Sequence, residues 1–250
     1  MLTIGDVIVK SAEKFRWAIK LFPLLLSSFS YCEVEPGVHV LKVEPACYEM
    51  RIVRAEGRQT VLELSDGAVA AVNGGFFSAE GEPRGILKID GIWHALPTKE
   101  RGAIGWKVGG TTTLFDRVLT VNARWESMEN IVGGAPLLIK NGRKITDFSC
   151  ERTLDSFLTL PHARTAVGVD CMGTWVFVAV DAPGMVMSEL ADLMETLNCL
   201  NALNLDGGGS TTLVIENKVM NSPLGDGDFD DLGELKLRPV SDAITIYEKN

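Results

Sequence analysis

The chain is poor in the residues that build metal clusters and disulfide frameworks. Its 250 residues include only three histidines, which are scattered, and five cysteines, with no Cys-x-x-Cys pair among them. Structural zinc sites and disulfide-rich folds depend on closely spaced ligands or on an even set of cysteines. We therefore expect buried, reduced cysteine thiols, no metal ligands at the site and no cofactor.

The chain also lacks an excess of basic residues and a hydrophobic run long enough to cross a bilayer. Lys and Arg number 24 against 33 Asp and Glu, so the formal net charge is -9. A negative net charge disfavours binding to nucleic acid polymers or anionic membranes, and a membrane-spanning helix needs about 20 apolar residues. Local arginines and backbone amides would therefore have to hold any small anionic ligand.

The composition otherwise suits a folded domain. Hydrophobic residues make up 46% of the chain and charged residues 23%, which is typical of a protein with a proper core. We expect residues 1–30 to form an amphipathic helix and residues 31–250 to form one domain, with a cytoplasmic location. The alternative for residues 1–30 is a signal segment, because basic residues precede the apolar residues 21–26; the protein would then be exported.

Hairpin signals dominate the domain. Asp90-Gly91, Gly109-Gly110, Asn141-Gly142 and Met172-Gly173 each separate short apolar runs, a pattern typical of tight two-residue turns. Ser188 is the expected N-cap of a helix with an apolar stripe at residues 190, 193, 194 and 197. We predict an α+β fold, mainly an antiparallel or mixed sheet with hairpins and a helix packed on it. Strands are expected at residues 38–43, 86–89, 104–108, 136–139, 174–180 and 243–247.

A glycine run is the most informative local feature. An apolar stretch at residues 202–205 leads into Asp206, then Gly207-Gly208-Gly209 and two hydroxyl residues, Ser210 and Thr211. Three consecutive glycines lose much conformational entropy on folding, so they indicate a close backbone approach or positive φ angles. Exposed N–H groups in such a turn form a concave anion site. A tight turn between strands is the alternative interpretation.

Three other motifs accompany the glycine run. They are Asn73-Gly74-Gly75-Phe76-Phe77, residues 163–168 (Ala-Arg-Thr-Ala-Val-Gly) and residues 238–244 (Arg-Pro-Val-Ser-Asp-Ala-Ile). In this order the four motifs resemble those of the phosphodiester glycosidase family, over roughly residues 70–247. The resemblance implies a hydrolase that acts on a sugar joined through its anomeric carbon to a phosphodiester.

Cleavage at the anomeric carbon would release a phosphate monoester, which is already a good leaving group. The protein must then stabilise the charge that accumulates on the departing phosphate. The planar fork of an arginine and a cluster of backbone amides both suit this task. We expect Arg164 and the amides of Gly207, Gly208 and Gly209 to bind the phosphate, with Arg238 behind them.

A carboxylate is also needed, to activate water or to stabilise an oxocarbenium-like centre. Asp206 is the first candidate, because the adjoining glycines would place it at the anion site. Asp181 ends an apolar strand, although it could instead cap a turn. Glu189 matches a helix-start glutamate of the family, although the helix dipole alone favours an acidic residue there.

The remaining expectations concern smaller groups. Asn73, Gly74, Thr165 and Ser210 are expected to bind substrate, and Phe76 and Phe77 to lie in the core. The acidic residues 226–231 fail the EF-hand pattern, since position 231 is Asp where glycine is required. We expect a solvated loop there, with an irregular calcium site as the weaker alternative.

The combined hypothesis is a hydrolase that cleaves the sugar C1–O bond of a sugar 1-phosphodiester or a nucleotide-like glycosyl phosphate. The first alternative is a non-catalytic binding module that sequesters a phosphorylated sugar or nucleotide. A weaker one is a phosphodiesterase that cleaves the P–O bond, which usually requires paired metals. The expected partner is a small-molecule or glycan phosphodiester, with no nucleic acid polymer and no membrane span. The oligomeric state stays open.

Overall fold

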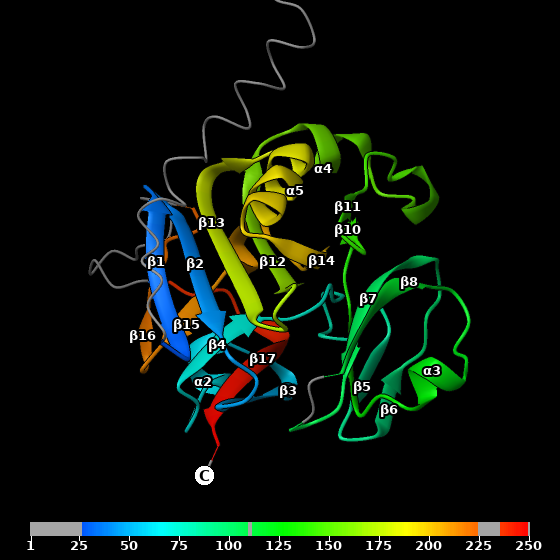
Figure 1. The fold of residues 1–250 in the computed structure, drawn as a ribbon, viewed down its shortest axis with the longest axis horizontal. Coiled ribbons are helices and arrows are strands. Elements are labelled where there is room, and N and C mark those ends of the chain that lie inside the picture. Colours follow the sequence, from blue (N-terminus) through cyan, green and yellow to red (C-terminus); the bar gives the residue numbers. More distant parts are fainter. Residues whose placement is uncertain (1–26, 110–111, 225–235, 250) are drawn as a thin grey trace, which may run out of the picture.

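A computed structural model describes residues 27–109, 112–224 and 236–249, which form three antiparallel sheets (Figure 1). The largest sheet has seven strands and carries helix α5 (Met187–Thr196) on one face. Its strand order is β1 (Phe29–Glu35), β2 (Val38–Val43), β13 (Trp175–Met185), β12 (His162–Asp170), β14 (Cys199–Asn204), β10 (Leu137–Lys140) and β11 (Arg143–Lys144).

Strand β13 shows why this sheet is buried on both faces. Successive side chains of a strand point to opposite faces. Trp175 and Phe177 enter the central core of the molecule, whereas Val176 and Val178 pack with the apolar stripe of α5. Because both faces of β13 are buried, apolar residues follow one another along it without polar residues in between, as the sequence shows.

The second sheet has five strands, and the short helix α2 (Val61–Leu64) packs on it. Thr60 caps α2, because its hydroxyl accepts the N–H of Glu63 while the Glu63 carboxylate accepts the N–H of Thr60. The strand order is β16 (Lys218–Val219), β15 (Leu213–Ile215), β4 (Ala70–Asn73), β17 (Val240–Glu248) and β3 (Tyr48–Gln59).

The third sheet, at the right in Figure 1, is capped by helix α3 (Ala123–Glu126). Its strand order is β6 (Ile92–Ala95), β5 (Leu87–Ile89), β9 (Asn130–Gly133), β7 (Arg101–Trp106) and β8 (Thr113–Val118). The 3-10 turn η1 (Ser149–Glu151) and helix α4 (Asp155–Thr159) connect β11 to β12, and the turn η2 (Gly208–Ser210) follows β14.

One tryptophan joins the three sheets. Trp106 on β7 donates its indole N–H to the carbonyl of Met50 on β3 at 2.7 Å. The same ring meets Trp175 of β13 edge-on, with ring centroids 5.3 Å apart. Burying both indoles removes a large apolar area from water, so this contact holds the third sheet against the other two.

The predicted fold class is confirmed, because the sheets are antiparallel and α5 packs on the largest one. The two-residue hairpin turns at Asp90-Gly91 and Asn141-Gly142 are also confirmed. Met172-Gly173 lies in a hairpin as well, but residues 171–174 separate β12 from β13, so that turn is longer than expected. Residue 110, the expected N-terminal helix at residues 1–26 and the acidic residues 226–231 lie outside the described residues. Among those that are described, no helix combines the length and apolarity that a membrane span requires.

Two details differ from the expectations. The N-cap of α5 is Val186 and not Ser188, since the helix begins two residues earlier. Strand β1 begins at Phe29, and the expected division of the chain after residue 30 stays a prediction. All five cysteines are free, but only Cys199 is buried, and three of them are exposed at the surface.

Candidate active site

Four strand ends meet at one place between the sheets: the ends of β4 and β14 and the beginnings of β12 and β17. The side chain of Asn73 forms hydrogen bonds to three of the segments that meet here. Its amide nitrogen donates to the carbonyl of Asp206 at 2.7 Å. Its amide oxygen accepts from the Thr165 hydroxyl at 2.7 Å and from the N–H of Thr212 at 3.2 Å. Asn73 and Thr165 are buried and their side chains bind each other, so both hold the four strand ends together.

Gly74 brings two aspartates together. Its carbonyl accepts the N–H of Asp206 at 3.2 Å, and its own N–H donates to the carbonyl of Asp242 at 2.9 Å. A Cβ atom at position 74 would lie 1.8 Å from the Asp242 Oδ1 atom, so only glycine fits. Gly75 then donates its N–H to the same Oδ1 atom at 3.1 Å. The role of Gly74 is thus to admit Asp242.

The two carboxyl groups share an electrostatic environment that disfavours charge. Burial raises the pKa of Asp206, while the Ser210 hydroxyl, the Gly207 N–H and the positive charge of Arg238 oppose that rise. The Ser210 hydroxyl makes no hydrogen bond of good geometry with any described residue, but it lies close enough to favour the charged form of Asp206. Burial raises the pKa of Asp242 to about 6, and the charge of Asp206 adds to the effect. A proton near neutral pH is therefore available at this pair.

The glycine loop after Asp206 has the conformation that its composition predicts. A Cβ atom at Gly207 would lie 2.6 Å from the carbonyl oxygen of Ala163, and Gly208 has a φ of +59°. The N–H groups of Gly208 and Gly209 donate to no acceptor among the described residues, and both glycines are partly exposed. Two N–H groups without a described acceptor in one turn have the arrangement from which anion sites are built.

Arg164 does not present its fork to this loop. Its Nε atom donates to the carbonyl of Met185 at 3.0 Å, and Nη2 donates to the carbonyls of Phe157 and Leu160 at 2.6 and 3.2 Å. The guanidinium lies over the Phe157 ring at 4.6 Å. Burial lowers its pKa to about 10, so it stays charged at neutral pH. Only Nη1 lacks a partner among the described residues, so Arg164 mainly holds α4 against the end of β13.

Arg238 is the cation that lies at the loop. Its Cδ atom would be 3.5 Å from a Cβ atom built on Gly209, and its charge lowers the pKa of Asp206. The guanidinium is exposed and lies 5.5 Å from the centroid of the Phe77 ring. Arg238, expected to stand behind Arg164, is therefore the arginine placed to meet an anion here.

Asp181 is anchored away from these groups. Its Oδ1 atom accepts from the Asn221 amide at 2.9 Å, and Oδ2 accepts from the Ser222 N–H at 2.9 Å and from His39 Nε2 at 3.3 Å. Burial would raise the pKa of Asp181, but these hydrogen bonds outweigh it and lower the pKa. The same Asn221 amide donates to the Thr211 carbonyl at 3.0 Å. The geometry thus indicates an anchor for the segment that follows the glycine loop.

Glu189 occupies the first turn of α5. Its carboxylate accepts the N–H of Val186 at 3.3 Å, so it satisfies one of the free donors at the helix N-terminus. The structure therefore shows the helix-capping role, and no contact joins Glu189 to Asp206.

Phe76 and Phe77 were expected in the core and are half-buried. Phe77 packs against the apolar cluster around α2, and both rings line a pocket of about 400 Å³ beside the glycine loop. No group of three or more His, Cys, Asp or Glu side chains in the described part of the chain is arranged to hold a metal ion.

A family model described as phosphodiester glycosidase matches residues 66–247. The chain belongs to the phosphodiester glycosidase family. Among its relatives is N-acetylglucosamine-1-phosphodiester alpha-N-acetylglucosaminidase from Bos taurus, 31% identical over 190 residues, which cover 66% of this chain and 35% of that protein. The Mus musculus protein of the same name is 28% identical over 78% of this chain and 41% of its own length. The chain thus spans well under half the length of these relatives.

Solved structures share the fold of this family member. The zebrafish N-acetylglucosamine-1-phosphodiester alpha-N-acetylglucosaminidase catalytic domain, auto-inhibited by its pro-peptide, superposes with a TM-score of 0.70 at 22% identity and covers 88% of this chain and 82% of its own. A hypothetical protein from Synechocystis superposes with a TM-score of 0.73 at 18% identity over 88% of this chain and 61% of its own.

Asp242 was not singled out from the sequence, and the structure places it beside Gly74 and near Asp206. The signal was present, because Ser241 and Asp242 are polar residues inside an otherwise apolar strand that belongs to one of the four motifs. Asp242 is almost fully buried, and its carboxyl group occupies the space that a side chain at position 74 would need.

Proposed function

We propose that the protein hydrolyses the bond between the anomeric carbon of a sugar and the phosphate oxygen of a phosphodiester. The supporting observation is the junction of Asp206 with the free N–H groups of Gly208 and Gly209 and the exposed cation of Arg238. A carboxylate and an anion site lie side by side there. Membership in a hydrolase family favours this function over a non-catalytic binding module.

Each group has a distinct task in this proposal. The N–H groups of Gly208 and Gly209, with Arg238, stabilise the negative charge that grows on the departing phosphate. Asp206 is half-buried and faces this position, so it is the carboxylate that activates water or stabilises the anomeric carbon. Asp242 lies deeper and acts through Asp206 as a positioning residue, because the two carboxyl groups influence each other's protonation.

The position of the broken bond tests the proposal. The methyl phosphodiester of N-acetylglucosamine 1-phosphate carries the sugar named in the relatives, and it is hydrolysed in water enriched in oxygen-18. Mass spectrometry should find the label on the anomeric hydroxyl of the sugar and none on methyl phosphate. Label on the phosphate would show attack at phosphorus and overturn the proposal.

The Asp206→Asn variant tests the assignment of the carboxylate. An amide cannot accept a proton from water, so we expect kcat to fall by about 10²-fold or more while substrate affinity is retained. Undiminished turnover in this variant would remove Asp206 from the chemistry.

A further inference from the structure

The pocket beside the glycine loop gathers four cationic side chains in a chain whose net charge is -9. Arg84, Lys99, Arg101 and Arg152 line it. Within the described residues none of the four forms an ion pair with a carboxylate. Clustered cations repel one another unless an anion lies between them. The nearby carboxylates of Glu80, which Arg84 influences, and of Glu100 do not line this pocket, so the cations leave it suited to an anionic occupant.

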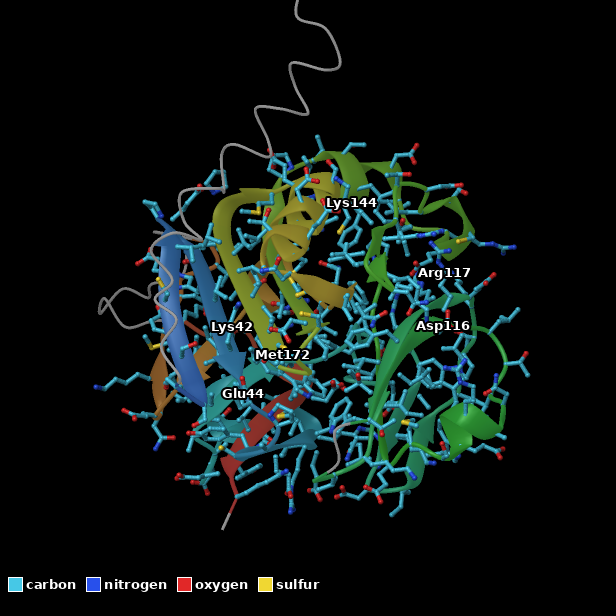
Figure 2. All side chains as sticks on the ribbon, in the orientation of Figure 1. Lys42, Glu44, Asp116, Arg117, Lys144 and Met172 are labelled. Atoms are coloured by element: carbon cyan, nitrogen blue, oxygen red, sulfur yellow. The ribbon has the colours of Figure 1, made fainter. Side chains whose placement is uncertain are left out.

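A buried carboxylate fixes the walls of the pocket. Glu151 has no exposed surface; its Oε2 atom accepts the N–H of Gly102 at 2.9 Å, and Oε1 accepts the N–H of Leu137 at 2.9 Å. The Nε atom of Arg117, labelled on β8 in Figure 2, donates to Glu151 Oε1 at 2.9 Å. The charge of Glu151 is therefore already balanced by Arg117. Because Arg101 precedes Gly102 and Arg152 follows Glu151, this one carboxylate sets the position of two pocket cations.

Two buried donors in the pocket wall have no partner among the described residues: Arg101 Nε and Thr153 Oγ1. An unsatisfied buried donor is unfavourable, and native proteins rarely leave one without a reason. Arg152 also has a φ of +49°, in the left-handed region that arginine rarely adopts. Strain and unsatisfied donors in one wall are typical of a binding site.

Three phenylalanines also line the pocket, and one of them contacts Arg238 beside the glycine loop. They are Phe76, Phe77 and Phe157, and the rings of Phe76 and Phe157 pack edge to face with centroids 6.0 Å apart. Phe77 lies under Arg238, whose charge acts on Asp206. The pocket therefore begins where the proposed leaving-group site ends.

We infer that this pocket is a second anion subsite, and that the leaving group of the substrate carries a further phosphate beyond the one attached to the sugar. The inference rests on the proposed function, because that function places the leaving group on the side of the glycine loop from which it can extend into the pocket. The second phosphate binds between Arg101, Arg152 and Thr153, and the body of the leaving group lies against the phenylalanine rings. A nucleoside diphosphate and a phosphorylated sugar share this chemistry.

Three substrates with the same sugar test the inference. They are the methyl phosphodiester of N-acetylglucosamine 1-phosphate, its phosphodiester with a phosphorylated sugar, and the uridine diphosphate ester. We expect kcat/KM to be at least about tenfold higher for one or both of the phosphate-bearing substrates than for the methyl ester. The preferred one identifies the source of the second phosphate. Equal values for all three would overturn the inference.

The double variant Arg101→Gln, Arg152→Gly should lose this preference, with about a tenfold fall on the phosphate-bearing substrate and less than about twofold on the methyl ester. Glycine suits the φ of residue 152. The exposed pair Arg84→Gln, Lys99→Gln repeats the test if the first variant does not fold. Arg143→Gln, exposed on β11, is the matched control and should leave both values unchanged. An equal loss on both substrates would contradict the inference.

Calorimetric titration with inorganic pyrophosphate separates this inference from the proposed function. Suppose that the double variant binds pyrophosphate about tenfold more weakly than the wild type, and that the wild type hydrolyses none of the three substrates. The anion subsite would then stand, and the proposed hydrolysis would be overturned. Equal pyrophosphate binding by the wild type and both pocket variants would overturn the subsite, whatever the activity.

Discussion

At the scale of single residues, folding places the Asp242 carboxyl group where a negative charge is unfavourable. Its pKa rises from 3.8 to about 6 on burial, so the folded state binds its proton more tightly than the unfolded state does. The stability that this proton provides is complete below pH 3.8 and is lost as the pH rises through 6. The loss amounts to about 3 kcal/mol at neutral pH.

The Asp242→Asn variant should therefore be more stable than the wild type at pH 7.5, by up to about 3 kcal/mol, and close to it at pH 4. The amide oxygen can still accept the Gly75 N–H. Urea unfolding at pH 4, 6 and 7.5 measures the effect, with the exposed Asp66→Asn as the control. A variant that is destabilised equally at all three pH values would contradict the pKa assignment. Because Asp242 positions Asp206, we expect turnover to fall in the same variant.

Arg164 makes structural hydrogen bonds with two of its three guanidinium nitrogens. Its Nε and Nη2 atoms serve three carbonyls on α4, the residue after it and β13. The ammonium group of lysine cannot reproduce that planar arrangement. Arg164→Lys should lower the free energy of unfolding by about 2–3 kcal/mol, measured by urea denaturation against Arg143→Lys. An Arg164→Lys variant that is fully stable but inactive would instead indicate that Arg164 binds the substrate.

At the scale of elements, the glycine loop offers a matched pair of substitutions. A methyl group at Gly207 would lie 2.6 Å from the carbonyl oxygen of Ala163, whereas one at Gly209 meets its nearest neighbours at 3.5 and 3.6 Å. Gly207→Ala should displace the loop from β12 and lower stability by about 1–3 kcal/mol. Gly209→Ala should change stability by less than about 1 kcal/mol. Thermal unfolding of the two variants compares them directly, and similar losses would mean that the loop does not need its close approach to β12.

The segment that follows the glycine loop depends on Asp181, and its pH response has the opposite sign from that of Asp242. Hydrogen bonds lower the pKa of Asp181 below 3.8, so its stabilising effect is present above that value and is lost as the pH falls through the lowered pKa. Asp181→Asn should therefore destabilise the protein at pH 7, with a difference that shrinks below pH 4. Urea unfolding at pH 7 and pH 3 tests this. A difference that does not depend on pH would assign Asp181 no charge-dependent role.

At the scale of the whole molecule, features that depend on neighbours in the sequence could be predicted and those that depend on distant contacts could not. The Asn141-Gly142 turn is encoded by the two residues themselves, which both have positive φ angles. Asn73 and Thr165 were both singled out from the sequence, but nothing local indicated that their side chains bind each other. The third sheet and its contact through Trp106 also depend on pairings that the sequence does not display.

The pocket that Arg84, Lys99, Arg101 and Arg152 line could be predicted from the sequence even less. Arg84 and Arg152 are separated by 68 positions (152 minus 84) and belong to no shared motif, so only the folded chain brings them together. The negative net charge also concealed them, because an average over the chain does not show a local cluster of one sign. The carboxylate of Glu151, which assembles this cluster, has no motif of its own.

The contact between Trp106 and Trp175 has a practical consequence. Two indole rings held 5.3 Å apart at an interplanar angle of 79° couple electronically and give a paired signal in far-ultraviolet circular dichroism. Trp106 ends β7, and Arg101 begins the same strand. If the third sheet loosened, this signal would be lost and the pocket cations would move apart at the same time. The hydrogen bonds around Asn73 would stay intact. The indole pair is thus a built-in optical reporter for the half of the site that binds the leaving group.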